Sequence, residues 1–176
     1  MSYTCVNTPP DDDYTLTGAR YIVGFQVVTG SDIVGSKLSG IKFSIKYVSG
    51  TTSGTLYCRL YDSSTTIPTP LHTFGSVDIS SLTSSFATYT FDTPDTTNTL
   101  ADGNLIGLEY SSTTGSPSLK IEELRTSDAQ GKSFDYTSTT GTIEILSGRC
   151  LYYCYKTTTG GGRVGLPPPP IVLGGY

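Results

Sequence analysis

Two neighbouring segments alternate strictly between apolar and polar residues, and this period of two restricts the fold more than any other feature of the chain. In residues 40–50, GIKFSIKYVSG, apolar side chains occupy every second position from Ile41 to Tyr47. Residues 55–62, TLYCRLYD, repeat the pattern. Alternation at this period is typical of strands with one buried face. The Gly/Thr/Ser stretch between them, SGTTSG, predicts that the two strands form a hairpin with a longer loop.

Eight further segments have strand composition, and nearly all are bounded by Gly, Pro, Asn, Asp or Ser. They are residues 19–28, 71–79, 86–92, 104–112, 118–126, 132–138, 141–146 and 149–157. Only residues 78–85, DISSLTSS, suggest a helical turn. Short strands without an amphipathic helix predict an all-β fold, an antiparallel two-sheet sandwich of jelly-roll type. At 176 residues the chain fits one such domain, which we place at residues 19–157, with extended arms at residues 1–18 and 158–176.

The composition disfavours several classes of partner. Charged residues make up 15% of the chain, the formal net charge is -4, and no Lys/Arg-rich arm is present, so we expect no nucleic-acid partner. No run of about 18 or more apolar residues occurs, so we expect no membrane span. The opening residues, MSYTCVNTPPDDDYT, lack the pattern of a secretory signal. We therefore expect either that a leader has been removed or that the protein leaves the cell by assembly into a particle.

The four cysteines are Cys5, Cys58, Cys150 and Cys154, and none of them forms a CxxC pair. Because the single histidine, His72, is distant from all four in the sequence, we expect no zinc site. On one strand Cys150 and Cys154 would share a face about 13 Å apart, too far to bridge each other. A disulfide would have to reach another strand, with Cys5 or Cys58 as its partner. Small buried thiols are the alternative.

The groups that could support catalysis do not form a recognisable set. His72, in TPLHTFGS, has no nucleophile motif near it. Paired carboxylates of the glycosidase type would have to come from Glu109, Glu122, Glu123 and Glu144, which lie on predicted strands. Glu122 and Glu123 point to opposite faces, and Glu144 alternates with isoleucines, so we interpret these residues as solvent-facing. We predict no catalytic residue and no enzymatic activity.

Two stretches carry the oxygen ligands that Ca²⁺ prefers: PDDDY (10–14) and LADGNL (100–105). The simpler interpretation, which we favour, is a solvated acidic segment in the first and a turn in the second, where Gly103 and Asn104 would supply positive φ. We therefore predict no metal site and no cofactor, and keep Ca²⁺ as the alternative.

Thirteen tyrosines and six phenylalanines give the chain many aromatic side chains. Tyr57 and Tyr61 flank Arg59 on the polar face of one predicted strand, and could form an aromatic platform for a sugar ring or a partner protein. Ordinary cross-strand pairs on an exposed sheet are the alternative. The tyrosines of residues 149–157 lie where one face must be core, so at least part of that group serves packing.

The chain ends in GGGRVGLPPPPIVLGGY, residues 160–176. Its glycines predict a hinge, and its four consecutive prolines favour the extended polyproline II conformation. Such a segment can lie along or add to an exposed sheet edge at low entropic cost. We predict that it contacts a neighbouring subunit, with packing against its own domain as the alternative. The predicted contact residues are Arg163, Val164, Leu166, Pro167, Pro168, Pro169, Pro170, Ile171, Val172, Leu173 and Tyr176.

Four phrases occur in order from Val34 to Thr157: VGSKLSGIKFSIKYVSGTTSGTLYCRLYDSS, LHTFGSVDISSLTSSFATYTFD, TLADGNLIGLEYSS and GRCLYYCYKT. Together they resemble jelly-roll modules of the carbohydrate-binding-module and galactose-binding-like type, found in secreted, cell-surface and phage or archaeal-virus structural proteins. The resemblance implies attachment, adhesion or decoration, and the fold does not choose among these roles. The chain has no Trp, the residue on which sugar-binding modules often stack a ring.

These observations lead to two functional hypotheses. The first is a non-enzymatic structural subunit of a particle or filament, most directly a capsid, decoration or tail component of a virion, whose arms contact further copies or other structural subunits. The second is a carbohydrate-binding or adhesion module that uses Tyr57, Arg59 and Tyr61. Both place the protein in a virion or on an extracellular surface.

Overall fold

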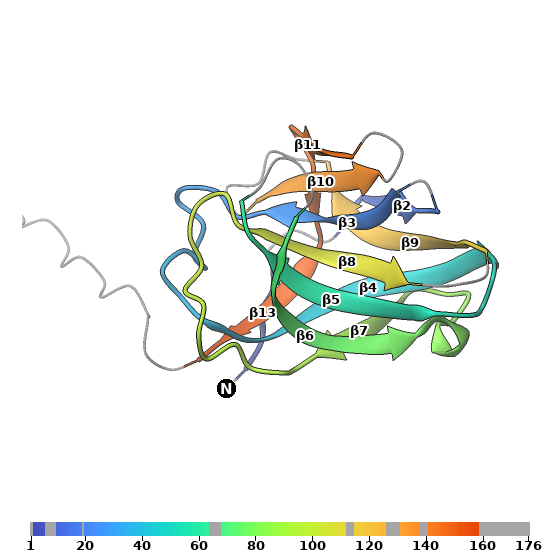
Figure 1. Cartoon of the computed structure of the whole chain (residues 1–176), viewed down its shortest axis with the longest axis horizontal. Coiled ribbons are helices and arrows are strands. Elements are labelled where there is room, and N and C mark those ends of the chain that lie inside the picture. Colours follow the sequence, from blue (N-terminus) through green and yellow to red (C-terminus); the bar gives the residue numbers. More distant parts are fainter. Residues whose placement is uncertain are drawn as a thin grey trace, which may run out of the picture.

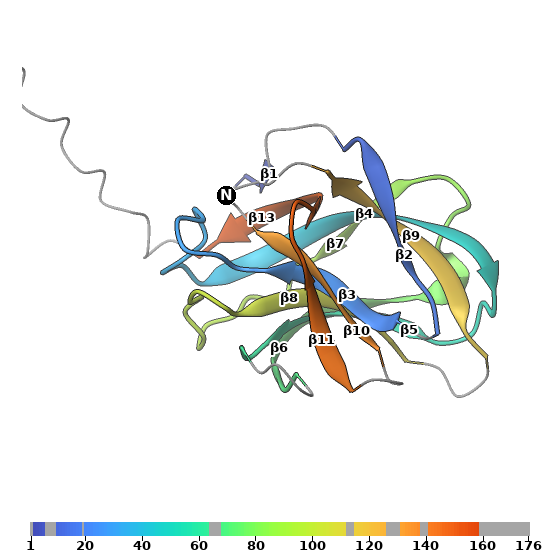
Figure 2. The ribbon, with the colours of Figure 1, turned by 90° about the horizontal axis from the view of Figure 1, so that it is seen from above.

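The computed structural model describes residues 2–5, 10–18, 20–63, 68–111, 115–125, 131–137 and 141–158. Within these residues the fold is nearly all β, and two antiparallel sheets form the layers seen in Figures 1 and 2. The all-β, two-sheet prediction is therefore confirmed. The helical turn expected in residues 78–85 is the 3-10 turn η1 (Ile79–Ser81).

Seven strands form one sheet, called sheet A here. They are β1 (Thr4–Cys5), β2 (Asp12–Leu16), β4 (Leu38–Gly50), β7 (Ala87–Phe91), β9 (Pro117–Leu124), β12 (Cys150–Leu151) and β13 (Tyr153–Thr157). Six strands form the second sheet, sheet B, in the order β11 (Thr142–Leu146), β10 (Lys132–Thr137), β3 (Arg20–Gln26), β8 (Leu105–Ser111), β5 (Thr55–Tyr61) and β6 (Pro70–Asp78). All pairings within each sheet are antiparallel, from β1 with β13 to β5 with β8.

The strands β4 and β5 have the predicted alternation but do not form the predicted hairpin. β4 pairs with β7, β9 and β13 in sheet A, whereas β5 pairs with β6 and β8 in sheet B. Each strand buries one apolar face, and the two faces meet across the interior because the connection crosses from one sheet to the other. β4 ends at Gly50, which has φ 92° and at which a Cβ atom would come within 2.3 Å of the Ser116 carbonyl oxygen.

Sheet A is forked: β4 and β9 pair along part of their length and then separate, and the β12–β13 segment lies between them. β13 pairs with β4 on the side opposite β7, and β12 pairs with the part of β9 that continues beyond its contact with β4. Tyr152 separates the two short strands and donates its backbone N–H to Glu122 O at 2.9 Å. The interruption also corrects a prediction: Cys150 is buried in the core, whereas Cys154 lines a surface pocket, so they do not share a face.

The main core lies between the two sheets. β4 contributes Ile41, Phe43 and Ile45, and the facing strands of sheet B contribute a matching set of apolar residues. The Phe25 ring stacks on the Tyr153 ring with centroids 3.9 Å apart and planes 5° apart. Part of the 149–157 tyrosine group is therefore core, as predicted.

A second apolar cluster lies on the other face of sheet B. Its buried members are Ile22, Tyr61, Leu105, Phe134 and Tyr136. Beneath it, β3 and β8 bring two glycines opposite each other, and a Cβ atom on either would meet the Phe134 ring at 2.5 Å or 3.0 Å. The missing side chains let this ring lie against the sheet.

The segment expected as an N-terminal arm contributes strands to the sandwich instead. β1 pairs with β13 and β2 pairs with β9, so residues 4–5 and 12–16 belong to sheet A. The acidic residues of β2 are stabilised there by cations on or beside β9, which the sequence alone does not reveal. Of the predicted C-terminal arm, Thr158 is described, and residues 159–176 lie outside the described residues.

Candidate functional site

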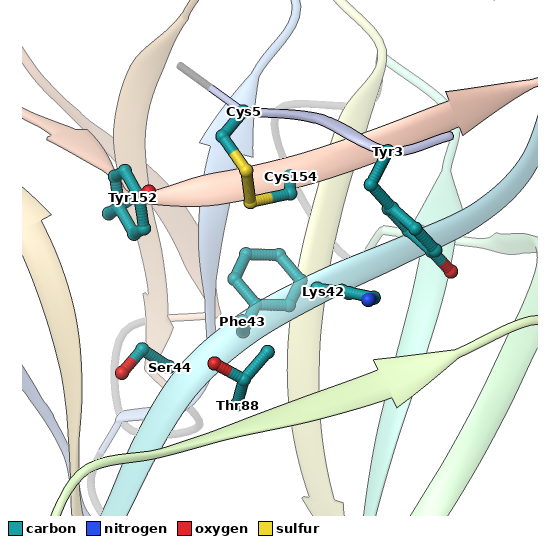
Figure 3. Close-up of a pocket in the computed structure, with 8 residues that line it drawn as sticks. All are labelled: Tyr3, Cys5, Lys42, Phe43, Ser44, Thr88, Tyr152 and Cys154. Carbon is teal, nitrogen blue, oxygen red and sulfur yellow. A yellow bond between two sulfur atoms is a disulfide. The ribbon is translucent and has the colours of Figure 1, made fainter. Parts of the chain in front are cut away.

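A surface pocket of about 290 Å³ lies on the outer face of sheet A. Its lining comes from β1, β4, β7 and β13 and from the residues that adjoin them. The lining residues are Tyr3, Cys5, Lys42, Phe43, Ser44, Thr88, Tyr152 and Cys154. Figure 3 shows Tyr152 and Tyr3 at opposite ends of the pocket, with the disulfide between them.

The disulfide that borders the pocket joins Cys5 to Cys154. The two residues are directly opposite each other in the β1–β13 pairing, which gives each side chain a short path to the other. The other two cysteines, Cys58 and Cys150, are buried thiols. Both alternatives left open by the sequence therefore occur, one for each pair of cysteines. Burial raises the pKa of the Cys58 thiol well above its ordinary value.

Tyr3 organises the cationic end of the pocket. Lys42 Nζ lies 4.0 Å from the centroid of the Tyr3 ring, and Lys156 Nζ lies 5.2 Å from it. The Tyr3 hydroxyl donates a hydrogen bond to the Asp92 carboxylate. Asp92 also forms an ion pair with Lys156, with 3.5 Å between Lys156 Nζ and Asp92 Oδ1. Gly40 leaves room for this contact, because a Cβ atom there would come within 2.5 Å of the Tyr3 hydroxyl oxygen.

The pocket combines hydrogen-bond donors with apolar surface. Lys42 is opposite Cys154 in the β4–β13 pairing, and Ser44 is opposite Thr88 in the β4–β7 pairing, so an ammonium group and two hydroxyls lie close together. The Tyr152 ring and the disulfide supply the apolar part of the wall. Such a lining suits a ligand that presents carbonyl or hydroxyl oxygens next to a hydrophobic surface.

The residues of the predicted aromatic platform contact one another and Glu109, and one of the three, Tyr61, is buried. Tyr57, Arg59 and Tyr61 lie on the outer face of sheet B. Arg59 and Tyr61 both contact Glu109, and Arg59 also contacts the Tyr57 ring. Arg59 Nη1 lies 2.5 Å from Glu109 Oε2, and the Tyr61 hydroxyl donates to the same oxygen at 2.7 Å. The Arg59 guanidinium carbon is 4.3 Å from the Tyr57 ring centroid. Tyr61 is 0% exposed, so its ring presents no surface to a ligand.

The prediction that the strand carboxylates face solvent is wrong for Glu123, which is 0% exposed. The Ser133 hydroxyl donates to Glu123 Oε1 at 3.0 Å, and Arg149 Nη1 lies 3.3 Å from Oε2. Burial raises the pKa of Glu123, while the Ser133 and Arg149 contacts oppose that rise. Glu109 is also held in an ion pair, whereas Glu144 is exposed as predicted.

A second buried carboxylate lies near the same end of the sandwich. The Tyr14 hydroxyl of β2 donates a hydrogen bond to Asp135 Oδ2 of β10 at 2.6 Å, which joins sheet A to sheet B through the interior. A buried hydrogen bond of this kind stabilises the alignment of the two sheets, because separating them would leave polar atoms unsatisfied.

The two acidic stretches form ordinary protein contacts. Asp12 is hydrogen-bonded by Arg125, which lowers the pKa of its carboxyl, and Asp13 pairs with Lys120 at 2.7 Å. In the second stretch Gly103 has φ 88°, which confirms the expected turn, but the positive φ expected at Asn104 is wrong, because no described residue other than glycine has one. Among the described residues, no group of three or more His, Cys, Asp or Glu side chains is close enough to hold a metal ion.

The remaining candidate for catalysis, His72, lies on the edge strand β6. Its Nε2 atom is 3.0 Å from the Thr93 carbonyl oxygen, and its ring meets the Phe74 ring edge-on at 4.8 Å between centroids.

None of the helices in the described part of the chain has the length and apolar character needed to cross a membrane.

The sequence did not indicate the pocket. The alternation of β4 places Lys42 and Ser44 on the polar face, but it gives no sign that Tyr3 and Tyr152 lie on either side of them. These contacts depend on the fork in sheet A and on β1, neither of which has a local signature. The predicted contact residues between Arg163 and Tyr176 lie outside the described residues.

A comparison with protein-family models, with curated proteins and with solved structures finds no match for this chain.

Proposed function

We propose that this protein is a non-enzymatic structural subunit of a particle or filament, with a sandwich of the jelly-roll type and a C-terminal segment that contacts neighbouring subunits. A capsid, decoration or tail component of a virion is the most direct form of this role. The protein would then act by binding further copies or other structural subunits.

The observation that carries the proposal is how firmly β13, the strand before the C-terminal segment, is held. β13 is paired on one side with β1 and on the other with β4, and the Cys5–Cys154 disulfide crosslinks it to β1. Directly after it, Thr158 donates its backbone N–H to Lys37 O at 2.8 Å. A force on the C-terminal segment would therefore be resisted by strands on both sides of β13, whereas an edge strand with a single neighbour would detach more easily. A disulfide also suits the oxidising surroundings of an extracellular surface or virion.

Light scattering coupled to size-exclusion chromatography tests this role. The full chain should have a mass above that of the monomer, rising with concentration. A matched variant in which residues 163–176 are replaced by an equal length of Gly and Ser should be monomeric with an unchanged circular dichroism spectrum. If the full chain stays monomeric at every concentration and shows no association with other structural subunits, the proposed role is wrong.

The second candidate is a carbohydrate-binding or adhesion module on a cell or virion surface. The favouring observation is that Glu109 holds Arg59 beside the half-buried Tyr57 ring, so that an aromatic and a cationic group lie together on the outer face of sheet B. Binding of the full chain on a glycan array, lost in Tyr57→Ala, would support this role. Binding that persists in that variant would place any glycan elsewhere.

A further inference from the structure

We infer that the pocket between Tyr3 and Tyr152 is the acceptor for the proline segment, Pro167–Pro170, of a second copy of this chain. The inference deepens the proposed function and rests on it, because it assigns the surface that the C-terminal segment would contact. The side chains that line the pocket and the sequence of the segment can therefore be compared directly.

The pocket has the lining that a proline-rich ligand requires. Polyproline segments bind to grooves lined by aromatic rings, because the flat rings pack against the pyrrolidine rings. Here Tyr152 and Tyr3 stand at opposite ends of the pocket, and the Cys5–Cys154 disulfide adds apolar surface between them. Tyr152 is half-buried and Tyr3 is fixed by Asp92, so both rings are positioned before any ligand arrives.

The hydrogen-bonding groups of the pocket and the segment are complementary. Proline has no backbone N–H, so four consecutive prolines present carbonyl oxygens and no donors. The pocket offers donors from the Lys42 ammonium and from the hydroxyls of Ser44 and Thr88. On this face the ion pairs among the described residues join Lys156 to Asp92 and Lys120 to Asp13, and neither includes Lys42.

The charge of the segment also fits. Residues 164–176, VGLPPPPIVLGGY, contain no charged side chain, so they bring no cation towards Lys42 or Lys156. An apolar segment can cover the Tyr152 ring and the disulfide without leaving a charged group unpaired.

The direction of β13 favours a second copy over the same chain as the source of the segment. β13 begins directly after Tyr152 and runs past Cys154 towards Tyr3, so it leads away from the centre of the pocket (Figure 3). Beyond it, both the backbone N–H and the hydroxyl of Thr158 are bonded to Lys37 O, which fixes the exit from the sheet. A segment that returned to the pocket of its own chain would have to reverse this direction.

Docking of this kind is heterologous, because the pocket and the segment are different surfaces. After one such contact, one copy keeps a free acceptor pocket and the other keeps a free segment, so the contact propagates into a ring or a filament. This agrees with a structural role in an assembly.

The deciding experiment mixes two full-length variants. Tyr152→Ala removes the aromatic end of the pocket and leaves the segment intact. Pro168→Ser with Pro169→Ser breaks the segment and leaves the pocket intact. Each variant alone should be monomeric by light scattering, and an equimolar mixture should form heterodimers and no larger species, because only one productive pocket and one productive segment are present.

Two controls make the result interpretable. Lys42→Ala changes one outward-facing donor and should weaken self-association by about tenfold, the effect of losing one hydrogen bond to a charged group. This variant covers the case in which Tyr152→Ala fails to fold. Tyr57→Ala, on the other sheet, should associate like the wild type.

Each contrary outcome overturns a different statement. If the proline variant is monomeric while Tyr152→Ala and Lys42→Ala associate like the wild type, the pocket is not the acceptor, although the proposed function survives. The inference also fails if Tyr152→Ala changes only glycan binding, or if the mixture stays monomeric. If the proline variant associates like the wild type, the inference fails again, and the replacement of residues 163–176 then decides the proposed function.

Discussion

Cys5 and Cys154 are directly paired across β1 and β13, and the disulfide between them closes a loop with a sequence separation of 149 residues. Crosslinks that span such long loops restrict the unfolded chain strongly, so the double variant Cys5→Ser, Cys154→Ser should lose about 2–5 kcal/mol in the free energy of unfolding. Urea denaturation would measure this. Reducing agent should lower the stability of the wild type to that of the variant and leave the variant unchanged. Equal stability of the oxidised wild type and the variant would contradict the prediction.

The contact between Gly24 and the Phe134 ring gives a second prediction. A Cβ atom at Gly24 would come within 2.1 Å of the Ile106 carbonyl oxygen and 2.5 Å of the ring, whereas one at Gly107 would meet the Val23 carbonyl oxygen at 2.9 Å. Because backbone atoms cannot move aside, Gly24→Ala should cost about 1–3 kcal/mol of stability or more. Gly107→Ala should cost less, and the reverse order in thermal unfolding would show that the Phe134 ring does not lie against the sheet as described.

The strands could be predicted from the sequence because their signal is local. Alternation in β4 and β5 follows from one buried face, and the turn at Gly103 follows from a requirement for positive φ. The pairing of those strands could not be predicted in the same way. Alternation shows that a strand has an inner face, but it does not show which of two sheets provides its neighbours.

The site residues were harder to predict because their environments depend on distant partners. Glu123 is buried beside Ser133 and Arg149, and neither lies close enough in the sequence to indicate the contact. In the same way, Tyr61 and Arg59 share the Glu109 carboxylate of β8, a contact that the sequence does not indicate, and Tyr61 is buried whereas Tyr57 is half-buried.

The hydrogen bond from Tyr61 to Glu109 gives a third prediction. Tyr61 is fully buried and donates to a carboxylate oxygen at 2.7 Å, so Tyr61→Phe should lower the free energy of unfolding by about 1–3 kcal/mol. Tyr57→Phe, on the same face but half-buried, is the matched control and should stay within about 0.5 kcal/mol of the wild type. Urea denaturation of the two variants measures this difference. If Tyr61→Phe leaves the free energy of unfolding unchanged, the hydrogen bond to Glu109 does not stabilise the fold.

The buried carboxyl of Glu123 predicts an unusual dependence of stability on pH. Burial raises its pKa in the folded protein, so the folded state binds a proton more readily than the unfolded state does. The stabilising contribution of the protonated form is therefore complete below the ordinary pKa of glutamate and is lost as pH rises through the higher folded pKa. Asp12 acts in the opposite sense: its pKa is lowered by Arg125, so its contribution is lost only as pH falls through a value below 3.8.

Above the pH range in which Asp12 takes up a proton, lowering the pH from neutral should stabilise the wild type relative to Glu123→Gln, because the glutamine side chain has no carboxylate to protonate. The difference in free energy of unfolding between the two proteins should therefore change in favour of the wild type as pH falls towards 4.5, the ordinary pKa of glutamate. Ser133→Ala removes a hydrogen bond that lowers the pKa of Glu123, so it should move this change to higher pH. Urea denaturation across the pH range measures all three proteins, and parallel profiles for the wild type and Glu123→Gln would contradict the burial of an ionisable Glu123.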